Sequence, residues 1–257
     1  MILVMAGTSD ARELALQIQQ AGYPLLTTVV TDSAARFMEE AGLPVMKGRL
    51  TAEALSALIR EKGIRALVDA THPFAEEASK NAIAAAQASE VPYIRYERDR
   101  ISIENHPLIT FADDYEQAAE LAAAKGGVVM LTTGSKTLHI FAKRLLGLPG
   151  TTLVARMLPR LDNMEKCAEL GVEQKNIIAM QGPFSKELNK ALYAHYQVTL
   201  MITKESGKVG AVDEKLESAL EMGIETIVIG RPAVDYGTSF GHFDDVLTKL
   251  NELLQEA

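Results

Sequence analysis

The sequence predicts an α/β protein of two domains, each with a mainly parallel sheet flanked by helices. Short β-branched runs alternate with amphipathic segments of helical length through most of the 257 residues. Strands separated by helices need crossover connections, which produce parallel sheets covered on both faces. The alternation breaks once, over residues 97–112, and we therefore expect one domain over residues 1–97 and a second over residues 98–257.

In the first domain, apolar β-forming runs such as ILVM and LLTTVV predict the strands, and amphipathic segments between them predict the helices. The glycines in AGY, AGL and KGI stand where helix C-caps belong, because a left-handed residue commonly ends a helix there. The expected strands are 2–5, 25–30, 44–47, 66–70 and 93–96. The expected helices are 10–21, 33–41, 51–62 and 75–89.

The segment ERDRISIENHPLITFADD is charged, contains a proline, and predicts a linker or a crossing strand. The alternation then resumes to the end of the chain. The expected strands are 128–133, 152–156, 176–180, 198–203 and 226–230. The expected helices are 113–124, 137–146, 160–170, 185–195, 212–222 and 242–255.

Composition excludes several classes of protein. The chain is 47% hydrophobic and 23% charged, and no apolar run approaches the roughly 18 residues of a membrane span. The start MILVMAG has no basic region before its apolar run, so a signal peptide is not expected. The lone Cys167 excludes an internal disulfide, fits a reducing cytoplasm and is expected to pack in the core. A net charge of -8 argues against a nucleic-acid binder but not against a small anionic substrate.

The chain also lacks the patterns of several catalytic sites. Its five histidines show no metal-ligand spacing, so we expect no metal site. No C-x-x-C pair and no G-x-S-x-G elbow occur. In open parallel sheets, ligands bind beyond the carboxyl ends of the strands. The loops that follow the strands are therefore the candidate binding segments: 6–10, 31–33, 71–74, 132–136, 156–160, 181–186, 203–210 and 230–233.

The first candidate loop lies within MAGTSDARELA, residues 5–15. Gly7, Thr8 and Ser9 form a short turn between a strand and a helix, and Ser9 or Asp10 can cap that helix. Backbone N–H groups at a helix start form an anion site suited to a pyrophosphate. The spacing is not G-x-G-x-x-G, so an ordinary capped turn between strand and helix is an equally good interpretation.

An acid follows the second strand in VVTDSAA. Asp32 lies 25 residues after Gly7, near the place where a dinucleotide fold positions a carboxylate on the adenosine ribose. A carboxylate there would repel a 2′-phosphate and favour NADH over NADPH. The alternative is that Asp32 or Ser33 simply caps the next helix.

The stretch LVDATHPFAEE, starting at residue 67, puts a Thr-His-Pro turn between a strand and a helix. Pro73 suits the first turn of a helix, Thr71 can cap it, and Phe74 can pack or shield. A lone histidine in such a loop is structural or exposed in most proteins. Because His72 follows a strand beside the expected cofactor turn, contact with cofactor or substrate is the competing interpretation.

In the second domain, cations follow the strands in TTGSK, RMLPR, QGPFSKELN and TKESGKVG. Lys136, Arg156, Lys186 and Lys204 could together receive several carboxylates, with arginine the better bidentate partner. For any one of them a solvated surface position is an equal alternative. TKESGKVG lacks the order of a Walker A loop.

Seven segments in order, AGTSDARELA, DATHPFA, TTGSK, RMLP, GPFSKELN, TKESG and GIETIVIGRP, resemble the precorrin-6A reductase family of cobalamin biosynthesis, including its cobalt-precorrin-6A branch. The likeness covers nearly the whole chain. It implies two Rossmann-like domains with a cleft between them. It also implies hydride transfer from a reduced nicotinamide dinucleotide to a double bond of a ring-contracted tetrapyrrole.

The resemblance also implies roles for individual residues. Gly7, Thr8 and Ser9 would bind the cofactor, with Thr71 and His72 in the loop close by. The substrate, rimmed with acetate and propionate groups, would lie against Lys136, Arg156, Lys204, Ser206 and Gly207. Thr31-Asp32-Ser33 stands where NADPH-using members carry a basic residue, so NADH is the expected donor. His72, a bound water or another acid could supply the proton.

Two other functions stay open from the sequence: a transferase on a similar scaffold, and a non-catalytic sensor that binds a dinucleotide. Hydride transfer needs no protein nucleophile, so the missing triad is consistent with the reductase. Any cobalt would arrive chelated in the substrate. We expect neither a nucleic acid nor a membrane as partner, and the sequence sets no oligomeric state, although a monomer is compatible with it.

Overall fold

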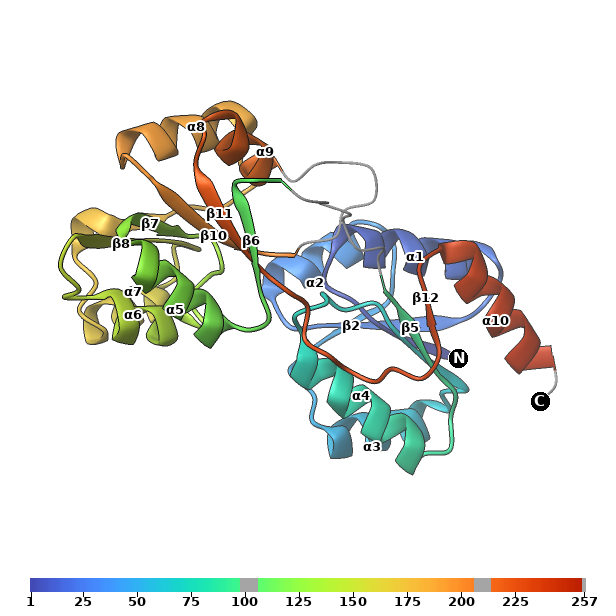
Figure 1. Ribbon diagram of the computed structural model, residues 1–257. Helices are drawn as coiled ribbons and strands as arrows, with labels where there is room; N and C mark the ends of the chain where they lie inside the picture. Colours follow the sequence, from blue (N-terminus) through green and yellow to red (C-terminus); the bar gives the residue numbers. More distant parts are fainter. Residues whose placement is uncertain (98–105, 206–213, 256–257) are drawn as a thin grey trace. The chain divides into compact units, whose positions relative to one another are not determined.

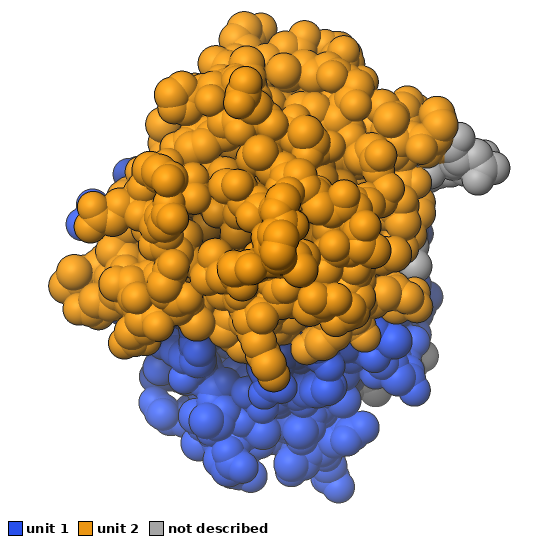
Figure 2. Space-filling view, turned by 60° about the vertical axis from the view of Figure 1, so that its left-hand side comes forward, with its two compact units in different colours: residues 1–99, 232–257 blue, residues 100–231 orange. Residues whose placement is uncertain are grey.

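The computed structural model describes residues 1–97, 106–205 and 214–255 (Figure 1). The chain forms two compact units, Met1–Asp99 with Pro232–Ala257, and Arg100–Arg231 (Figure 2). This division differs from the expected one, which assigned everything after residue 97 to the second domain. The physical reason is that the last strand and the last helix complete the first sheet, so the chain crosses between the units twice.

The first unit contains a six-stranded sheet in the order β12-β5-β4-β1-β2-β3, and its described strand pairs are all parallel. Read from the other edge, this is the 3-2-1-4-5-6 order of dinucleotide-binding sheets. Its strands are β1 (Ile2–Met5), β2 (Leu25–Val29), β3 (Val45–Lys47), β4 (Ala66–Asp69), β5 (Tyr93–Tyr96) and β12 (Ser239–Phe240). Its helices are α1 (Ser9–Gln20), α2 (Asp32–Glu39), α3 (Ala52–Lys62), α4 (Glu76–Ala88) and α10 (Phe243–Gln255).

Alternate residues of the first sheet face two different cores. Ile2 and Val4 pack with α1, α2 and α10, and Leu3 and Met5 pack with α3 and α4. The ribbon shows α3 and α4 together on one side of the sheet (Figure 1). Helix α10 buries Val246 and Leu250 in the same core as α1, which holds the C-terminal segment on this unit.

The second unit contains a six-stranded sheet in the order β6-β11-β10-β7-β8-β9, again with parallel pairs. Its strands are β6 (Ile109–Ala112), β7 (Gly127–Leu131), β8 (Thr151–Met157), β9 (Ile177–Ala179), β10 (Leu200–Lys204) and β11 (Glu225–Ile229). Its helices are α5 (Tyr115–Lys125), α6 (Leu138–Leu145), α7 (Leu161–Glu169), η1 (Gln174–Asn176), α8 (Lys186–His195) and α9 (Glu214–Glu221). One core joins β7, β8 and β10 to α8 and α9, and Cys167 is buried in α7, as expected.

The two sheets share their strand order. Five strands of the second unit, β7 to β11, repeat the order of β1 to β5, and only the edge strand beside the fifth comes from a different place in the chain. That edge strand is β12 in the first unit and β6 in the second. β6 begins within the segment expected to be a linker or crossing strand.

Local signals explain why the helices begin and end where they do. Thr8, Thr31 and Thr51 are N-caps whose hydroxyls accept a backbone N–H three residues on. Gly63 ends α3 in the left-handed conformation, with φ of 59°. Because such capping residues are local features of the sequence, the predicted helix boundaries lie within a few residues of the observed ones.

Candidate functional site

The strand order reverses between β1 and β4 in the first unit. Because these strands are parallel neighbours, the loops after Met5 and Asp69 leave the same edge of the sheet side by side. Ala70 N–H donates to the Met5 carbonyl at 2.9 Å, which ties the two loops together at their first residues. We call residues 6–9 the cofactor turn and residues 70–75 the corner. The crevice at such a reversal is where open α/β sheets bind ligands.

The cofactor turn is shaped by Gly7 and Thr8. Gly7 has φ of 144°, a conformation that other residues rarely adopt, and a Cβ built there would meet no atom within 4 Å. Thr8 accepts the Ala11 N–H on its hydroxyl at 3.4 Å, so Thr8, not Ser9 or Asp10, is the N-cap of α1. The open space at Gly7 and the first N–H groups of a 12-residue helix fit a pyrophosphate.

Asp32 is the first residue of α2, three residues after the end of β2, the strand that pairs with β1 on the other side from β4. Thr31 caps α2, so neither Asp32 nor Ser33 has the capping role that the sequence left open. The Asp32 carboxylate, 77% exposed, accepts a hydrogen bond from Lys47 Nζ at 2.5 Å. That hydrogen bond, with the Lys47 charge, lowers the pKa of Asp32.

The corner is built by side chains that bind its backbone. Asp69 Oδ1 accepts the Thr71 N–H at 3.0 Å and the Thr71 hydroxyl at 2.6 Å. His72 Nδ1 accepts the Phe74 N–H at 3.2 Å, so the imidazole carries its proton on Nε2. Thr71 is buried and occupied by these bonds, whereas His72 is partly exposed.

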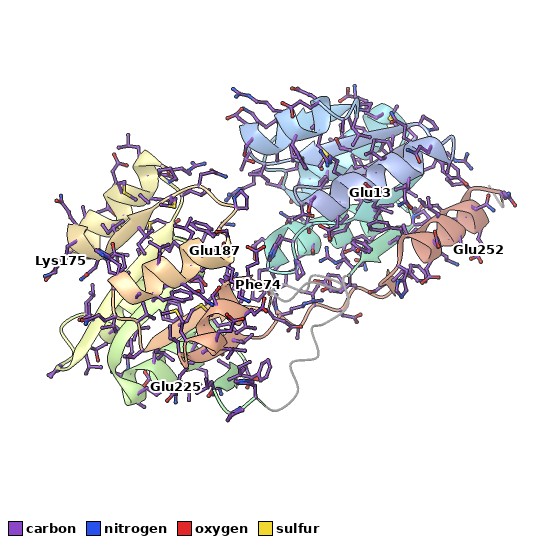
Figure 3. All side chains as sticks on the ribbon, turned by 90° about the horizontal axis from the view of Figure 1, so that it is seen from above. Glu13, Phe74, Lys175, Glu187, Glu225 and Glu252 are labelled. Carbon is purple, nitrogen blue, oxygen red and sulfur yellow. The ribbon has the colours of Figure 1, made fainter. Side chains whose placement is uncertain are left out.

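The corner delays the helix that was expected to begin near residue 75 with Pro73 in its first turn. Helix α4 begins at Glu76, and its N-cap Ala75 makes no side-chain cap bond. Thr71 does not cap it either, because its hydroxyl donates to Asp69. The Ala75 N–H instead donates to the His72 carbonyl at 2.7 Å, which closes a turn ahead of the helix. Phe74 belongs to that turn, its ring centroid 5.9 Å from that of His72 (Figure 3).

Two cations of the first unit were not singled out from the sequence. Arg12, in the first turns of α1, stacks on Phe37 with its guanidinium carbon 3.7 Å from the ring centroid. Its Nε is buried with no hydrogen-bond partner among the described residues. Arg95, on β5, is fully buried against Asp69. A basic residue next to the cofactor turn was visible in AGTSDAR, but nothing in YIRY marks a buried arginine.

In the second unit the equivalent reversal lies between β7 and β10, and Lys204 is the last residue of β10. Burial, and then the charges of Lys136 and Lys215, lower the pKa of Lys204 to about 8. Its Nζ lies 5.8 Å from the ring centroid of Tyr115, the first residue of α5. Lys136 and Lys204 are thus close enough to interact, and Lys215 is a third cation that the sequence argument missed.

The other predicted cations have different surroundings. Arg156 is buried, donates to Asn189 Oδ1 at 2.7 Å and lies 4.1 Å from the centroid of the Phe184 ring. Lys186 forms ion pairs with Glu217, at 3.1 Å, and with Glu221, and both carboxylates belong to α9. Ser206 and Gly207 lie outside the described residues.

A buried ion pair closes the carboxyl ends of β10 and β11. Arg231 Nε lies 3.4 Å from Glu205 Oε1, and both side chains are almost fully buried. Within residues 1–97, 106–205 and 214–255, no group of three or more His, Cys, Asp and Glu side chains could hold a metal ion. Over the same ranges, no helix is both long enough and apolar enough to cross a bilayer.

Comparisons of the sequence with known proteins identify a family of reductases. The sequence model of the family described as precorrin-6x reductase CbiJ/CobK matches residues 1–251. The cobalt-precorrin-6A reductase of Priestia megaterium is 58% identical over 97% of this chain and 98% of its own. That of Salmonella typhimurium is 38% identical over 90% and 87%, and the precorrin-6A reductase of Rhodococcus erythropolis is 30% identical over 92% and 91%.

A solved structure supports the fold. The structure described as CobK precorrin-6A reductase superposes with a TM-score of 0.78 and covers 98% of this chain and 96% of its own, at 24% sequence identity. At that sequence identity the match is evidence for the fold alone. Two parallel α/β sheets, as predicted from the alternation of strands and helices, are therefore confirmed.

Proposed function

The chain belongs to the precorrin-6x reductase CbiJ/CobK family, and from that membership we propose that it reduces a double bond of a precorrin-6A macrocycle with a nicotinamide dinucleotide. The observation that carries the proposal is the pairing of cofactor turn and corner at the reversal of a 3-2-1-4-5-6 sheet. When bound, the reduced nicotinamide supplies the hydride. The protein supplies binding, orientation and a proton.

The cofactor would be held by the first unit. The N–H groups at the start of α1 would receive the pyrophosphate, and Gly7 leaves its backbone open to it. Thr8 and Ser9 flank that site, and His72 belongs to the neighbouring loop. Arg12, stacked on Phe37, adds a cation in the same first turns of α1.

We propose NADH as the preferred donor. Asp32 is exposed at the end of β2, where a carboxylate accepts hydrogen bonds from ribose hydroxyls and repels a 2′-phosphate. Lys47 holds the carboxylate in its charged form, which the lowered pKa expresses. The same lysine also reduces the repulsion, so the preference is expected to be moderate.

The macrocycle would bind through its carboxylates to the second unit. Lys204, Lys136 and Lys215 form a group of interacting cations at the reversal of the second sheet. Arg156 is held by Asn189 and Phe184, so its planar fork is preorganised. We propose the cobalt-containing macrocycle, because the relative at 58% identity is described as a cobalt-precorrin-6A reductase, whereas the relative from Rhodococcus erythropolis, described as a precorrin-6A reductase, is 30% identical.

For the proton we propose His72. Its Nδ1 accepts the Phe74 N–H, which leaves the ring proton on Nε2 and fixes the orientation of the ring. An imidazole held in one tautomer can donate to a neighbouring carbon or to a bridging water without first reorienting.

The experiment is an anaerobic turnover assay with purified protein. Cobalt-precorrin-6A and precorrin-6A are each offered with NADH and with NADPH, and dinucleotide oxidation is followed together with the mass of the product. We expect the fastest turnover with cobalt-precorrin-6A and NADH, and one deuterium in the product from deuterated NADH. Folded protein that oxidises neither dinucleotide with either macrocycle would refute the proposed function.

A further inference from the structure

A buried ionic cluster lies directly beneath the corner. We define it as Asp69, Arg95, Glu97 and Tyr93, from β4 and β5 and the residue after β5. The side chains of Asp69 and Arg95 are 0% exposed, and that of Glu97 is 19% exposed. Arg95 Nη1 donates to Asp69 Oδ1 at 2.9 Å, and Nε donates to Glu97 Oε2 at 2.7 Å. Burial opposes the charge of Arg95, but the two carboxylates outweigh it and raise its pKa.

The two oxygens of Asp69 have different tasks. Oδ1 accepts from the Thr71 N–H, the Thr71 hydroxyl and Arg95, and Arg95 Nη1 also lies 3.2 Å from the Thr71 hydroxyl. Oδ2 accepts from the Tyr93 hydroxyl at 2.8 Å. One oxygen therefore binds the corner, and the other accepts a hydrogen bond from Tyr93 of β5.

Stability is a weak explanation for this cluster. Removing two charges from water is expensive, and a buried ion pair often contributes no more than apolar residues of the same volume. Apolar residues in these positions could not bind the backbone N–H and the hydroxyl of Thr71 in one fixed geometry. The residue that this geometry fixes is followed immediately by His72.

The cluster is covered by the segment that returns from the second unit. The Arg95 guanidinium carbon lies 4.8 Å from the centroid of the Tyr236 ring. Burial raises the pKa of Tyr236, so its phenol stays neutral over the cluster. Tyr236 thereby places an aromatic ring against the guanidinium of the ion pair.

We infer that Asp69 and Arg95 are positioning residues that hold Thr71, and through it His72, beside the cofactor turn. The inference rests on the proposed function for its consequence, since a displaced corner would lose the dinucleotide. It also changes the role of Thr71. We assign Thr71 a structural role beside the predicted cofactor contact, because its hydroxyl donates to Asp69 and accepts from Arg95.

Two substitutions separate positioning from stability. Thr71→Val and Tyr93→Phe each remove one hydroxyl donor from the same buried carboxylate, at Oδ1 and at Oδ2. Both keep the shape of the side chain. Thr71→Ser restores the hydroxyl at the corner and serves as the rescue variant. For each protein we would measure the melting temperature, the NADH affinity, and kcat and KM for the macrocycle.

We expect Thr71→Val to weaken NADH binding and lower kcat by about tenfold, because small displacements at a reactive site have large effects. The NADH affinity and kcat of Tyr93→Phe should stay within about twofold of the wild-type values, although its melting temperature should fall about as much as that of Thr71→Val. Thr71→Ser should recover most of the lost affinity, and KM for the macrocycle should change little. Equal losses of affinity and kcat in Thr71→Val and Tyr93→Phe would overturn the inference.

A second measurement keeps the inference separate from the proposed function. Amide hydrogen exchange of peptides covering residues 70–75 reports the corner directly, with no cofactor present. Thr71→Val should speed exchange there by about tenfold or more while Tyr93→Phe leaves it near the wild-type rate. If the wild type binds no dinucleotide but this contrast holds, the proposed function fails and the positioning stands. Equal exchange in the two variants would overturn the positioning in either case.

Discussion

The two units share their strand order, and each buries a carboxylate–arginine pair near the carboxyl ends of two neighbouring strands, yet the groups beside the two pairs differ. In the first unit Asp69, the last residue of β4, pairs with Arg95 within β5, whereas in the second unit Glu205, the residue after β10, pairs with Arg231, two residues after β11. Beside the pair, the first unit presents a glycine turn and a helix start, whereas the second presents interacting lysines. The shared strand order therefore determines which loops lie together at the carboxyl ends, and the residues of those loops determine which groups stand there.

The largest expected effect comes from removing the central cation of the second unit. Lys204→Ala should weaken macrocycle binding by about 10- to 100-fold, the range for a lost hydrogen bond to a charged group. NADH affinity should change much less. Titration of both ligands against the variant checks this. Equal losses would place Lys204 at the cofactor or in the fold. They would contradict the assignment of the dinucleotide to the first unit and of the macrocycle to the second.

The same lysine predicts a pH dependence. Its pKa is lowered from 10.5 to about 8, so the ammonium loses its proton, and macrocycle affinity falls, as the pH rises through about 8. Lys204→Arg should remove that decline, since a guanidinium stays charged. Folding stability should move the other way. Between pH 8 and 10.5 the unfolded state binds more protons, so stability rises with pH over that window.

A companion variant measures how much the burial of the Lys204 charge destabilises the fold. Below pH 8 the cost of burying the charge is fully present, so Lys204→Met should be more stable than the wild type at pH 7, by at most about 3 kcal/mol. Denaturant unfolding at pH 7 and at pH 10 checks it. A gain that does not shrink toward pH 10 would show that the extra stability has another origin.

The next effect tests the backbone site of the first unit. Gly7→Ala should weaken NADH binding by about tenfold or more, because a side chain at this φ costs about 1–3 kcal/mol or forces the turn to change. Macrocycle affinity should be preserved, whereas Lys204→Ala should weaken macrocycle binding and leave NADH affinity nearly unchanged. Calorimetric titration with NADH measures it, and Gly134→Ala in the equivalent loop of the second unit is the matched control. An unchanged NADH affinity would remove the cofactor turn from the site.

A smaller effect concerns the choice of dinucleotide. Asp32→Arg should shift the ratio of NADPH to NADH affinity upward by about tenfold, as expected when a repelling carboxylate becomes a phosphate-binding cation. Lys47→Ala is the informative control, because it exposes the carboxylate and should sharpen the preference for NADH. An unchanged ratio in both variants would mean that neither residue reaches the ribose.

The smallest effect is expected at Lys186. Its ammonium is bound by Glu217 and Glu221 on the surface of the second unit. Lys186→Ala should therefore change macrocycle KM by less than about twofold, since such exposed pairs contribute little. Steady-state kinetics beside Lys204→Ala measure the contrast. A loss as large as that of Lys204→Ala would show that position on a strand-end loop, and not the surroundings of the cation, decides its role.

The sequence was informative where the signal is local. Periodicity found the strands from Ile2–Met5 to Glu225–Ile229 and the helices between them, because each is specified by its own residues. The rule of carboxyl ends then placed Gly7, His72 and Lys204 in candidate binding loops, although it did not say which of these loops adjoin a strand-order reversal. It could place them there without the order itself, since the rule needs only the direction of each strand.

What the sequence hid depends on contacts between distant residues. The two-residue strand Ser239–Phe240 is too short to show a period, and its partner β5 lies more than 140 residues earlier in the chain. Arg95 read as one polar residue in a strand, because its burial follows from Asp69 on the neighbouring strand. The proton on His72 Nε2 follows from a turn that starts four residues before the helix. None of these leaves a pattern in one segment.

The return of the chain to the first unit sets an order of assembly during translation. Residues of the second unit emerge from the ribosome as one uninterrupted length, whereas β12, α10 and the tyrosine over Arg95 are synthesised after it. Until then the first unit has an unpaired edge at β5, and Arg95 lacks its contact with Tyr236. The first unit is therefore begun before the second and completed after it, and a chain that stops before β12 is left with an unfinished first sheet.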